Sequence, residues 1–190
     1  MLAGYFQELV LSRSVRDTAR VLDAVAGPAV GEPYHAPSPT SAFASCLHTP
    51  PARLRIGYST TTPLGDPLDP ECIAAIESTA RLCEALGHDV VEGAPEFDAM
   101  ALWQAFTTLL ASLVAWMIAD WGRRIGKTPT AEAFGEFVWA FGERGRALGA
   151  ADYLLAMQDV QRHVRDLSRF YTTHDVWLTT TLGQPPVELG

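Results

Sequence analysis

The chain has 190 residues, of which 48% are hydrophobic and 19% are charged, and its formal net charge is -8. This balance is typical of a soluble globular chain with enough apolar material for one domain, and it excludes an intrinsically disordered protein. An acidic chain also lacks the excess of Lys and Arg that nucleic acid or an anionic membrane surface requires. We therefore expect neither partner.

The cysteines and histidines show no metal-binding or disulfide pattern. The three cysteines have no CxxC spacing, and the five histidines have no HxH or HxxxH spacing, so we expect no metal or other cofactor. The N-terminal stretch MLAGYFQELVLSRS lacks the features of a signal peptide. The longest apolar run, 109–119, is shorter than the roughly 20 residues of a membrane span. These patterns favour a cytoplasmic protein.

The first expected element is a helix over 14–26. Ser14 is a suitable N-cap, and Asp17 adds negative charge in the first turn, where the helix dipole favours it. One face carries apolar residues at helical spacing, namely Val15, Ala19, Leu22 and Ala26. Gly27-Pro28 ends the helix, and a Pro/Gly-rich connection with a short helix around 41–47 follows.

A compact βαβ pattern comes next. Residues 54–58 (LRIGY) predict a strand, Asp69-Pro70 opens a helix that ends at Gly87, and residues 88–91 predict a second strand. A strand, a helix and a strand in this order predict a right-handed parallel crossover.

The rest of the chain is expected to be mainly helical. Periodic apolar residues predict helices over 98–121, 130–147 and 150–172, and residues 175–179 predict a last strand. The first of these helices is apolar over so much of its circumference that we expect burial on most sides. The fold class is therefore α/β, rich in helix, with an incomplete sheet. We expect one partial domain over 1–190, divided into a cap helix region (1–26), a connection (27–52), a βαβ unit (53–92), a helical region (93–174) and a strand with a tail (175–190).

No catalytic constellation is evident from the residues alone. Serine chemistry needs a base beside the nucleophile, but no G-x-S-x-G motif is present, no two serines are adjacent, and Lys127 is the only lysine. The dipeptide His174-Asp175 suggests a catalytic pair, but a histidine that interacts with the carbonyls at a helix end is the stronger interpretation.

Aromatic residues on the helix expected over 98–121 allow two interpretations. Trp103 and Phe106 either belong to a core, which is the more common outcome for such a stripe, or line an apolar substrate pocket. They are our candidate substrate-binding residues.

Several segments, taken together, resemble the amidase-signature hydrolases. The stretch 10–37 (VLSRSVRDTARVLDAVAGPAVGEPYHAP) resembles the region that follows the catalytic core of these enzymes. The segments LRIGYS, LGHDVVE, ERGRALGAADYLLAMQDVQR and DVWLTTTLGQPPVELG then follow in the family's order. The resemblance is to the branch that includes 6-aminohexanoate-cyclic-dimer hydrolases. Glu32 stands where the family commonly has Asp, and Thr179-Thr180-Thr181 stands where it often has Thr-Pro-Thr.

The resemblance implies amide hydrolysis by a Ser-cisSer-Lys triad, but no catalytic position of that triad transfers to this sequence. Arg13, Ser14 and Asp17 match the family's helix start and are expected to give structural support. The leading hypothesis is thus a C-terminal portion of an amidase, inactive alone, that would bind a small-molecule amide if complemented by the missing N-terminal part. Two alternatives are a non-catalytic module that pairs with itself or with a separate N-terminal chain, and an independent small enzyme with new chemistry.

Overall fold

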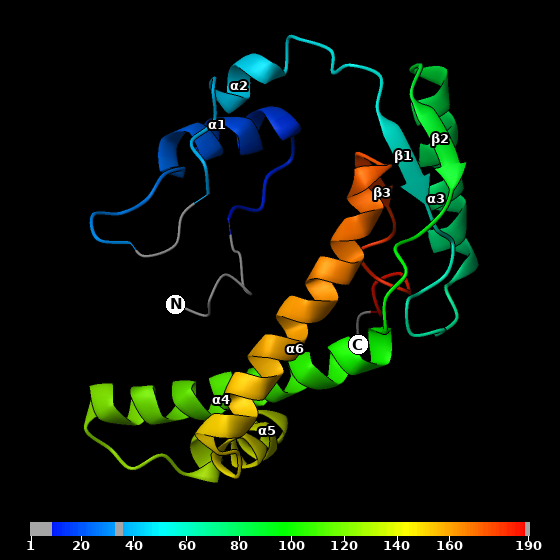
Figure 1. Ribbon diagram of the computed structural model, residues 1–190. Coiled ribbons are helices and arrows are strands. Elements are labelled where there is room, and N and C mark those ends of the chain that lie inside the picture. Colours follow the sequence, from blue (N-terminus) through cyan, green and yellow to red (C-terminus); the bar gives the residue numbers. More distant parts are fainter. Residues whose placement is uncertain (1–8, 33–35, 189–190) are drawn as a thin grey trace. The chain divides into compact units, whose positions relative to one another are not determined.

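The computed structural model of the protein describes residues 9–32 and 36–188 (Figure 1). The chain forms two compact units, Met1–Ala52 and Arg53–Gly190. The stretch 1–8, within which no signal peptide is expected, lies outside the described residues, as do residues 33–35 of the Pro/Gly-rich connection and the last two residues of the tail.

The first unit holds helix α1 (Val15–Val25) and the short helix α2 (Phe43–Cys46). Ser14 caps α1 as expected, because its hydroxyl oxygen accepts a hydrogen bond from the Asp17 N–H at 3.1 Å. The carboxylate of Asp23, on α1, in turn accepts hydrogen bonds from the N–H groups of Phe43 and Ala44, at 2.6 and 3.0 Å. Asp23 therefore caps α2 across the intervening connection. The predicted apolar face of α1 buries only Ala19, and Val15 is 73% exposed.

The second unit contains a parallel sheet of three strands in the order β2-β1-β3. Strands β1 (Arg55–Tyr58) and β2 (Asp89–Glu92) are joined by helix α3 (Pro70–Ala85), which confirms the predicted βαβ unit. Asp69 caps α3 by accepting the Glu71 N–H at 2.8 Å. Strand β3 (Val176–Leu178) pairs in parallel with the other side of β1. The α/β class is confirmed, and the sheet is open, because β2 and β3 have no further strand beside them in the described part of the chain.

Arg55 and Asp175 join the first and last strands of the unit. The Asp175 carboxylate accepts the Arg55 backbone N–H at 2.8 Å, the side-chain Nε–H at 3.2 Å and an Nη–H at 2.8 Å. The Asp175 N–H returns a hydrogen bond to the Arg55 carbonyl at 2.8 Å. The two residues are 120 positions apart in the chain. A bidentate arginine–carboxylate pair with added backbone bonds is directional, so it holds β3 in register with β1.

Gly57, in the middle of β1, permits close packing against the end of the helical region. A Cβ at this position would lie 2.5 Å from the Phe170 ring and 3.2 Å from the His174 ring. Those two rings are stacked, with centroids 4.1 Å apart and an interplanar angle of 2°. A side chain on Gly57 would push this pair away from the sheet.

Three long helices make up the helical region, and their bounds differ from the predicted ones. Helix α4 (Ala99–Ile125) runs four residues further than expected and ends at Gly126, whose φ of +67° suits a C-terminal glycine. Helix α5 (Glu136–Arg146) begins later than expected, after the 3-10 turn η1 (Ala131–Ala133), because Phe134 and Gly135 are extended. Helix α6 (Ala150–Ser168) continues into the 3-10 turn η2 (Arg169–Thr172).

Helix α4 contacts α5 and α6 and is less buried than its sequence predicted. Trp103 is 50% exposed and Trp121 is 53% exposed, so the expectation of burial on most sides was wrong. The helix is also longer than its apolar run, and its length and composition would suffice to cross a membrane. Only 28% of its most apolar window is buried, but core helices of soluble proteins pass the same test, so one such helix is weak evidence for a span.

The contact between α4 and α5 depends on a glycine. Gly145 is buried on α5, and a Cβ there would lie 2.0 Å from the Ala111 carbonyl oxygen and 2.9 Å from the Ala115 Cβ on α4. Replacing glycine by alanine within a helix gains about 1 kcal/mol of propensity, but overlap with backbone atoms costs more than that. The motif ERGR, quoted above for its family resemblance, therefore allows the two helix backbones to approach each other.

The Arg55–Asp175 pair predicts a pH dependence of stability. Hydrogen bonds from the Arg55 side chain, and then from its backbone N–H, lower the pKa of Asp175 to about 2. The unfolded value is about 3.9, so the pair stabilises the fold fully above that pH and less as the pH falls toward 2. We expect Asp175→Asn to lower the free energy of unfolding near pH 6, and the difference from the unmodified protein to shrink between pH 4 and 2, as measured by urea unfolding.

A matched control is Glu77→Gln, which removes one carboxylate from the exposed pair with Arg81 on α3, 3.7 Å away. Its expected cost near pH 6 is at most about 0.5 kcal/mol, typical of helix pairs four residues apart. A difference for Asp175→Asn that stays constant down to pH 2 would contradict the assignment.

Candidate functional site

The carboxyl ends of the three strands lie at one edge of the sheet. The strands are parallel, and they end at Tyr58, Glu92 and Leu178. Ligands of open α/β sheets bind outside the carboxyl ends of the strands, where the loops diverge. The segments that leave β1, β2 and β3 are therefore the first candidates for a binding site.

An apolar pocket of about 360 Å³ lies beyond the ends of β1 and β2. Its walls come from the loop after β1, the segment after β2 and the first turns of α4, and they comprise Thr62, Pro63, Leu64, Asp66, Phe97, Ala99, Leu102, Trp103 and Phe106. We call this set the aromatic pocket. Its volume is within the range of roughly 300–1,000 Å³ that is usual for small-molecule sites.

The structure places both candidate substrate-binding residues in this pocket. The ring centroids of Trp103 and Phe106 are 6.2 Å apart and the rings are tilted by 34°, which is a common arrangement for packed aromatic side chains. Trp103 is half exposed, so its ring is available to a ligand. A role for either residue in substrate binding stays a prediction.

Two local structures hold the pocket walls in place. In the loop after β1, the Thr62 hydroxyl donates to the Asp66 carbonyl at 2.9 Å, and the Gly65 N–H donates to the Thr62 carbonyl at 3.1 Å. On the opposite wall, Asp98 caps α4 by accepting the Ala101 N–H at 2.9 Å. The pocket is thus built on a closed turn and a capped helix rather than on an open segment.

Sequence reasoning missed Leu64, Phe97 and Leu102. Leu64 belongs to a segment predicted to be a loop, Phe97 directly precedes the helix predicted over 98–121, and Leu102 belongs to that helix, which was expected to be buried on most sides. Their position directly after two parallel strands is the signal that could have identified them. The lining is apolar apart from Thr62 and Asp66, which suits an aliphatic or aromatic group rather than a charged one.

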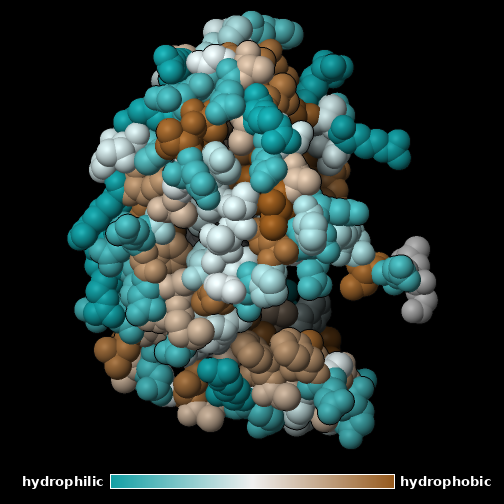
Figure 2. Space-filling view, turned by 90° about the vertical axis from the view of Figure 1, so that its right-hand side faces the viewer, coloured by the Kyte–Doolittle hydropathy of each residue, from teal (hydrophilic) through white to brown (hydrophobic). Residues whose placement is uncertain are grey.

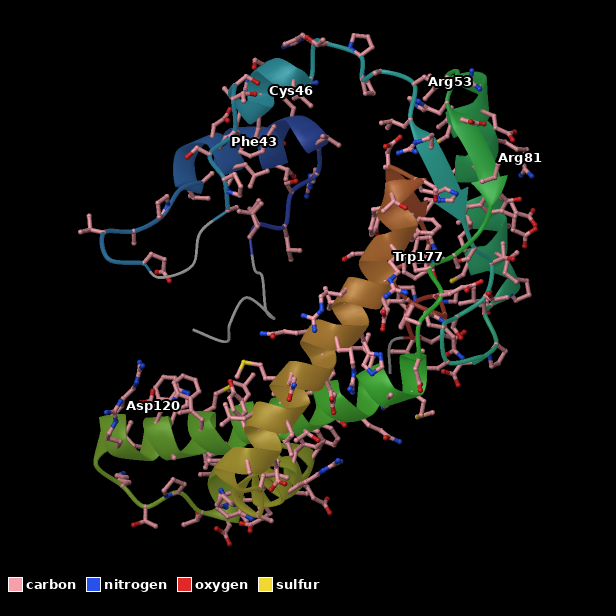
Figure 3. The ribbon with its side chains drawn as sticks, viewed as in Figure 1. Phe43, Cys46, Arg53, Arg81, Asp120 and Trp177 are labelled. Carbon is pink, nitrogen blue, oxygen red and sulfur yellow. The ribbon has the colours of Figure 1, made fainter. Side chains whose placement is uncertain are left out.

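Ser59 is a buried hydroxyl at the same edge of the sheet. It follows β1, is 5% exposed, and accepts a hydrogen bond from the Trp177 Nε1–H on β3 at 3.1 Å (Figure 3). A serine nucleophile needs a base that takes its proton, and in the part of the chain that the structure describes Ser59 has no hydrogen bond to a base. Lys127 lies exposed in the loop after α4. Ser59 therefore has a structural role, which is to accept the buried indole N–H.

His174 and Asp175 do not form a catalytic pair with each other. The His174 Nδ1 lies 3.4 Å from the Phe170 carbonyl and 3.0 Å from the Thr173 hydroxyl, whereas the Asp175 carboxylate is taken by Arg55. The structure thus confirms the interpretation of His174 as a residue that contacts a carbonyl at a helix end.

The residues expected to give structural support lie in the first unit. The Ser14 hydroxyl donates to the Asp17 carboxylate at 2.8 Å while it caps α1, and Arg13 is exposed directly before them. A support role beyond this cap stays a prediction. Among residues 9–32 and 36–188, no group of three or more His, Cys, Asp or Glu side chains is arranged to hold a metal ion.

The hydrogen bond between Ser59 and Trp177 predicts a measurable coupling. Ser59→Ala leaves the part-buried indole N–H of Trp177 without its acceptor, which we expect to destabilise the fold by about 1 kcal/mol. Trp177→Phe removes the donor instead. We expect the double variant to be less destabilised than the sum of the two single variants, as measured by a double-mutant cycle in urea. Additive effects would contradict the assigned bond, and Ser78→Ala on α3 serves as a control for the loss of a serine hydroxyl.

Comparison with known proteins identifies relatives of this chain. The sequence is 29% identical over 192 residues to the 6-aminohexanoate-cyclic-dimer hydrolases of Paenarthrobacter ureafaciens and of Pseudomonas sp. (strain NK87), covering 100% of this chain and 39% of each relative. The chain thus spans about two fifths of the length of these relatives.

Solved structures show the same relationship. A structure of 6-aminohexanoate cyclic dimer hydrolase superposes with a TM-score of 0.80 at 29% identity, over 86% of this chain and 34% of that one. A bacterial aryl acylamidase of the amidase-signature family has the same fold, with a TM-score of 0.68 at 17% identity over 85% of this chain and 33% of that one. The sequence profile of the family named Amidase matches residues 4–190. The chain therefore belongs to the amidase family.

Proposed function

We propose that this chain serves in the hydrolysis of a carboxylic amide C–N bond in the cytoplasm, and that it supplies a pocket wall rather than the nucleophile. In this proposal the serine nucleophile and its lysine belong to residues outside these 190. The substrate is a small-molecule amide with an apolar part, which packs against Trp103 and Phe106. Two relatives that resemble this chain over its whole length act, by their names, on a cyclic dimer of 6-aminohexanoate, an amide with aliphatic segments.

The observation that carries the proposal is the contrast between family membership and available chemistry. The family profile matches residues 4–190, yet the single lysine, Lys127, is exposed. The buried serine beside the sheet, Ser59, donates no proton to a base among the described residues. A serine without a base is a weak nucleophile at neutral pH, which supports the proposal that amide hydrolysis needs groups beyond those of residues 9–32 and 36–188.

The test is an activity measurement on the purified 190-residue chain. We expect no turnover of linear or cyclic aliphatic amides, and no covalent labelling by a fluorophosphonate, because no serine is activated. The matched variants are Ser59→Ala and Lys127→Met, which should behave like the unmodified chain. Turnover or labelling that disappears with either substitution would overturn the proposal. An active relative, labelled by the same probe, serves as the positive control.

The open sheet supports a second candidate function, a non-catalytic module that pairs with itself or with a separate N-terminal chain. Both outer strands carry exposed apolar side chains and lack a further strand in the described part of the chain, with Val91 on β2 48% exposed and Val176 on β3 38% exposed. Unpaired strand edges that carry apolar side chains favour pairing with another chain. On the face shown in Figure 2, hydrophobic residues are interspersed with hydrophilic ones.

Light scattering across a concentration series distinguishes a self-associating module from a protein that stays monomeric. We expect the mean mass to rise with concentration, and Val176→Lys to reduce that rise, because a charge at a strand edge opposes pairing. The control is Val187→Lys, the same change on the tail, where the side chain is 89% exposed and off the sheet. A constant monomer mass, together with no association with the N-terminal part of an amidase, excludes the module.

A further inference from the structure

A second apolar pocket, of about 590 Å³, lies at the other end of α4. Trp121 and Ile125, on the last turns of α4, form one wall, and Pro129 and Phe134 form the other. Lys127, the only lysine of the chain, also lines it. We call these five residues the lysine pocket.

The loop that forms this pocket is held against the helix. The N–H groups of Gly126 and Lys127 both donate to the Gly122 carbonyl, the latter at 3.1 Å, and Gly126 takes a φ of +67°. Gly122 also lets Pro129 approach, because a Cβ at 122 would lie 2.6 Å from the Pro129 ring. The turn is therefore closed by backbone hydrogen bonds and packing, and the pocket exists before any ligand binds.

Lys127 is the cation of this region that is not already paired. Asp120, labelled near this end of α4 in Figure 3, accepts from Arg123 at 2.5 Å and from Arg124 at 2.6 Å. These hydrogen bonds, that of Arg123 above all, lower the pKa of Asp120. Lys127 has no ion pair within the described ranges.

Glu132, on η1, is an acid next to the lining residue Ala133. Hydrogen bonds from its own backbone N–H and from the Thr130 hydroxyl lower its pKa. Glu132 therefore already has hydrogen-bond donors for its carboxylate, and it forms no ion pair with Lys127. The ammonium of Lys127 is left for an anion from outside the chain.

We propose that the lysine pocket binds a carboxylate that carries an unbranched apolar chain, such as a medium-chain fatty acid anion. The chain of the ligand packs on Trp121, Ile125 and Phe134, and its carboxylate accepts hydrogen bonds from the Lys127 ammonium. Each buried methylene of such a ligand strengthens its binding through the hydrophobic effect, and the ion pair orients the ligand with its charge toward Lys127. A small anion without an alkyl chain lacks the apolar contacts of the pocket. An uncharged alkyl ligand lacks the ion pair with Lys127.

This site is separate from the aromatic pocket. Trp103 and Trp121 are 18 residues apart on one helix, which is about 27 Å at 1.5 Å per residue. A medium-chain carboxylate cannot span that distance, so the two pockets bind independently. Failure of the amidase proposal leaves this inference intact, and the reverse holds as well.

Calorimetric titration of the 190-residue chain with decanoate, below its micelle concentration, tests the proposal. We expect saturable binding of one decanoate per chain. Lys127→Met keeps the apolar stem and removes the charge, so it should weaken decanoate binding roughly tenfold, the effect of about 1.4 kcal/mol, and leave decanol binding unchanged. Lys127→Arg should retain decanoate binding. Ala133→Trp, at an exposed lining position, should fill the pocket and abolish binding of both ligands.

The control variant is Trp103→Ala, which alters the aromatic pocket and should leave decanoate binding intact. Thermal unfolding of each variant shows whether it is folded, and the Lys127 substitutions are at an exposed loop position that packing does not constrain. The proposal fails if decanoate does not bind, if Lys127→Met binds it as tightly as the unmodified chain does, or if Trp103→Ala abolishes binding instead.

Discussion

The pair formed by Arg55 and Asp175 is the constraint on which the second unit depends. It joins residues 120 positions apart, and closing a loop between them carries an entropic cost that contacts of this kind help to offset. Three hydrogen bonds to one carboxylate, with a fourth returned by the backbone, concentrate the attraction at the first residue of β1. This pairing places β3 beside β1, so the carboxyl ends of three strands, rather than of two, meet at one edge.

Close packing within the second unit explains the positions of two glycines, Gly57 and Gly145. Gly57 allows the stacked rings of Phe170 and His174 to rest on β1, which brings the end of the helical region against the sheet. Gly145 does the same between α5 and α4. In both places a methyl group would overlap with existing atoms, so the dense packing of the interior selects glycine for contact rather than for backbone freedom.

Helix α4 connects the sheet to the two pockets. Its first turns complete the aromatic pocket beside β1 and β2, and its last turns form the lysine pocket with the loop that precedes α5. Helices α5 and α6 pack against it, and aromatic side chains stay half exposed toward both of its ends. The helix thus positions apolar surface where ligands, or other chains, can reach it.

The sequence by itself determined the local structure and the family. The N-caps Ser14 and Asp69, the βαβ unit and the last strand follow from capping preferences and from hydrophobic periodicity, which act within a few residues. The order of motifs along the chain indicated the amidase family. Only the tertiary structure decided that β3 pairs with β1, that Trp103 and Trp121 are half exposed, and that Leu64 and Phe97 share a pocket. Those outcomes depend on contacts between distant segments, which neither propensity nor periodicity encodes.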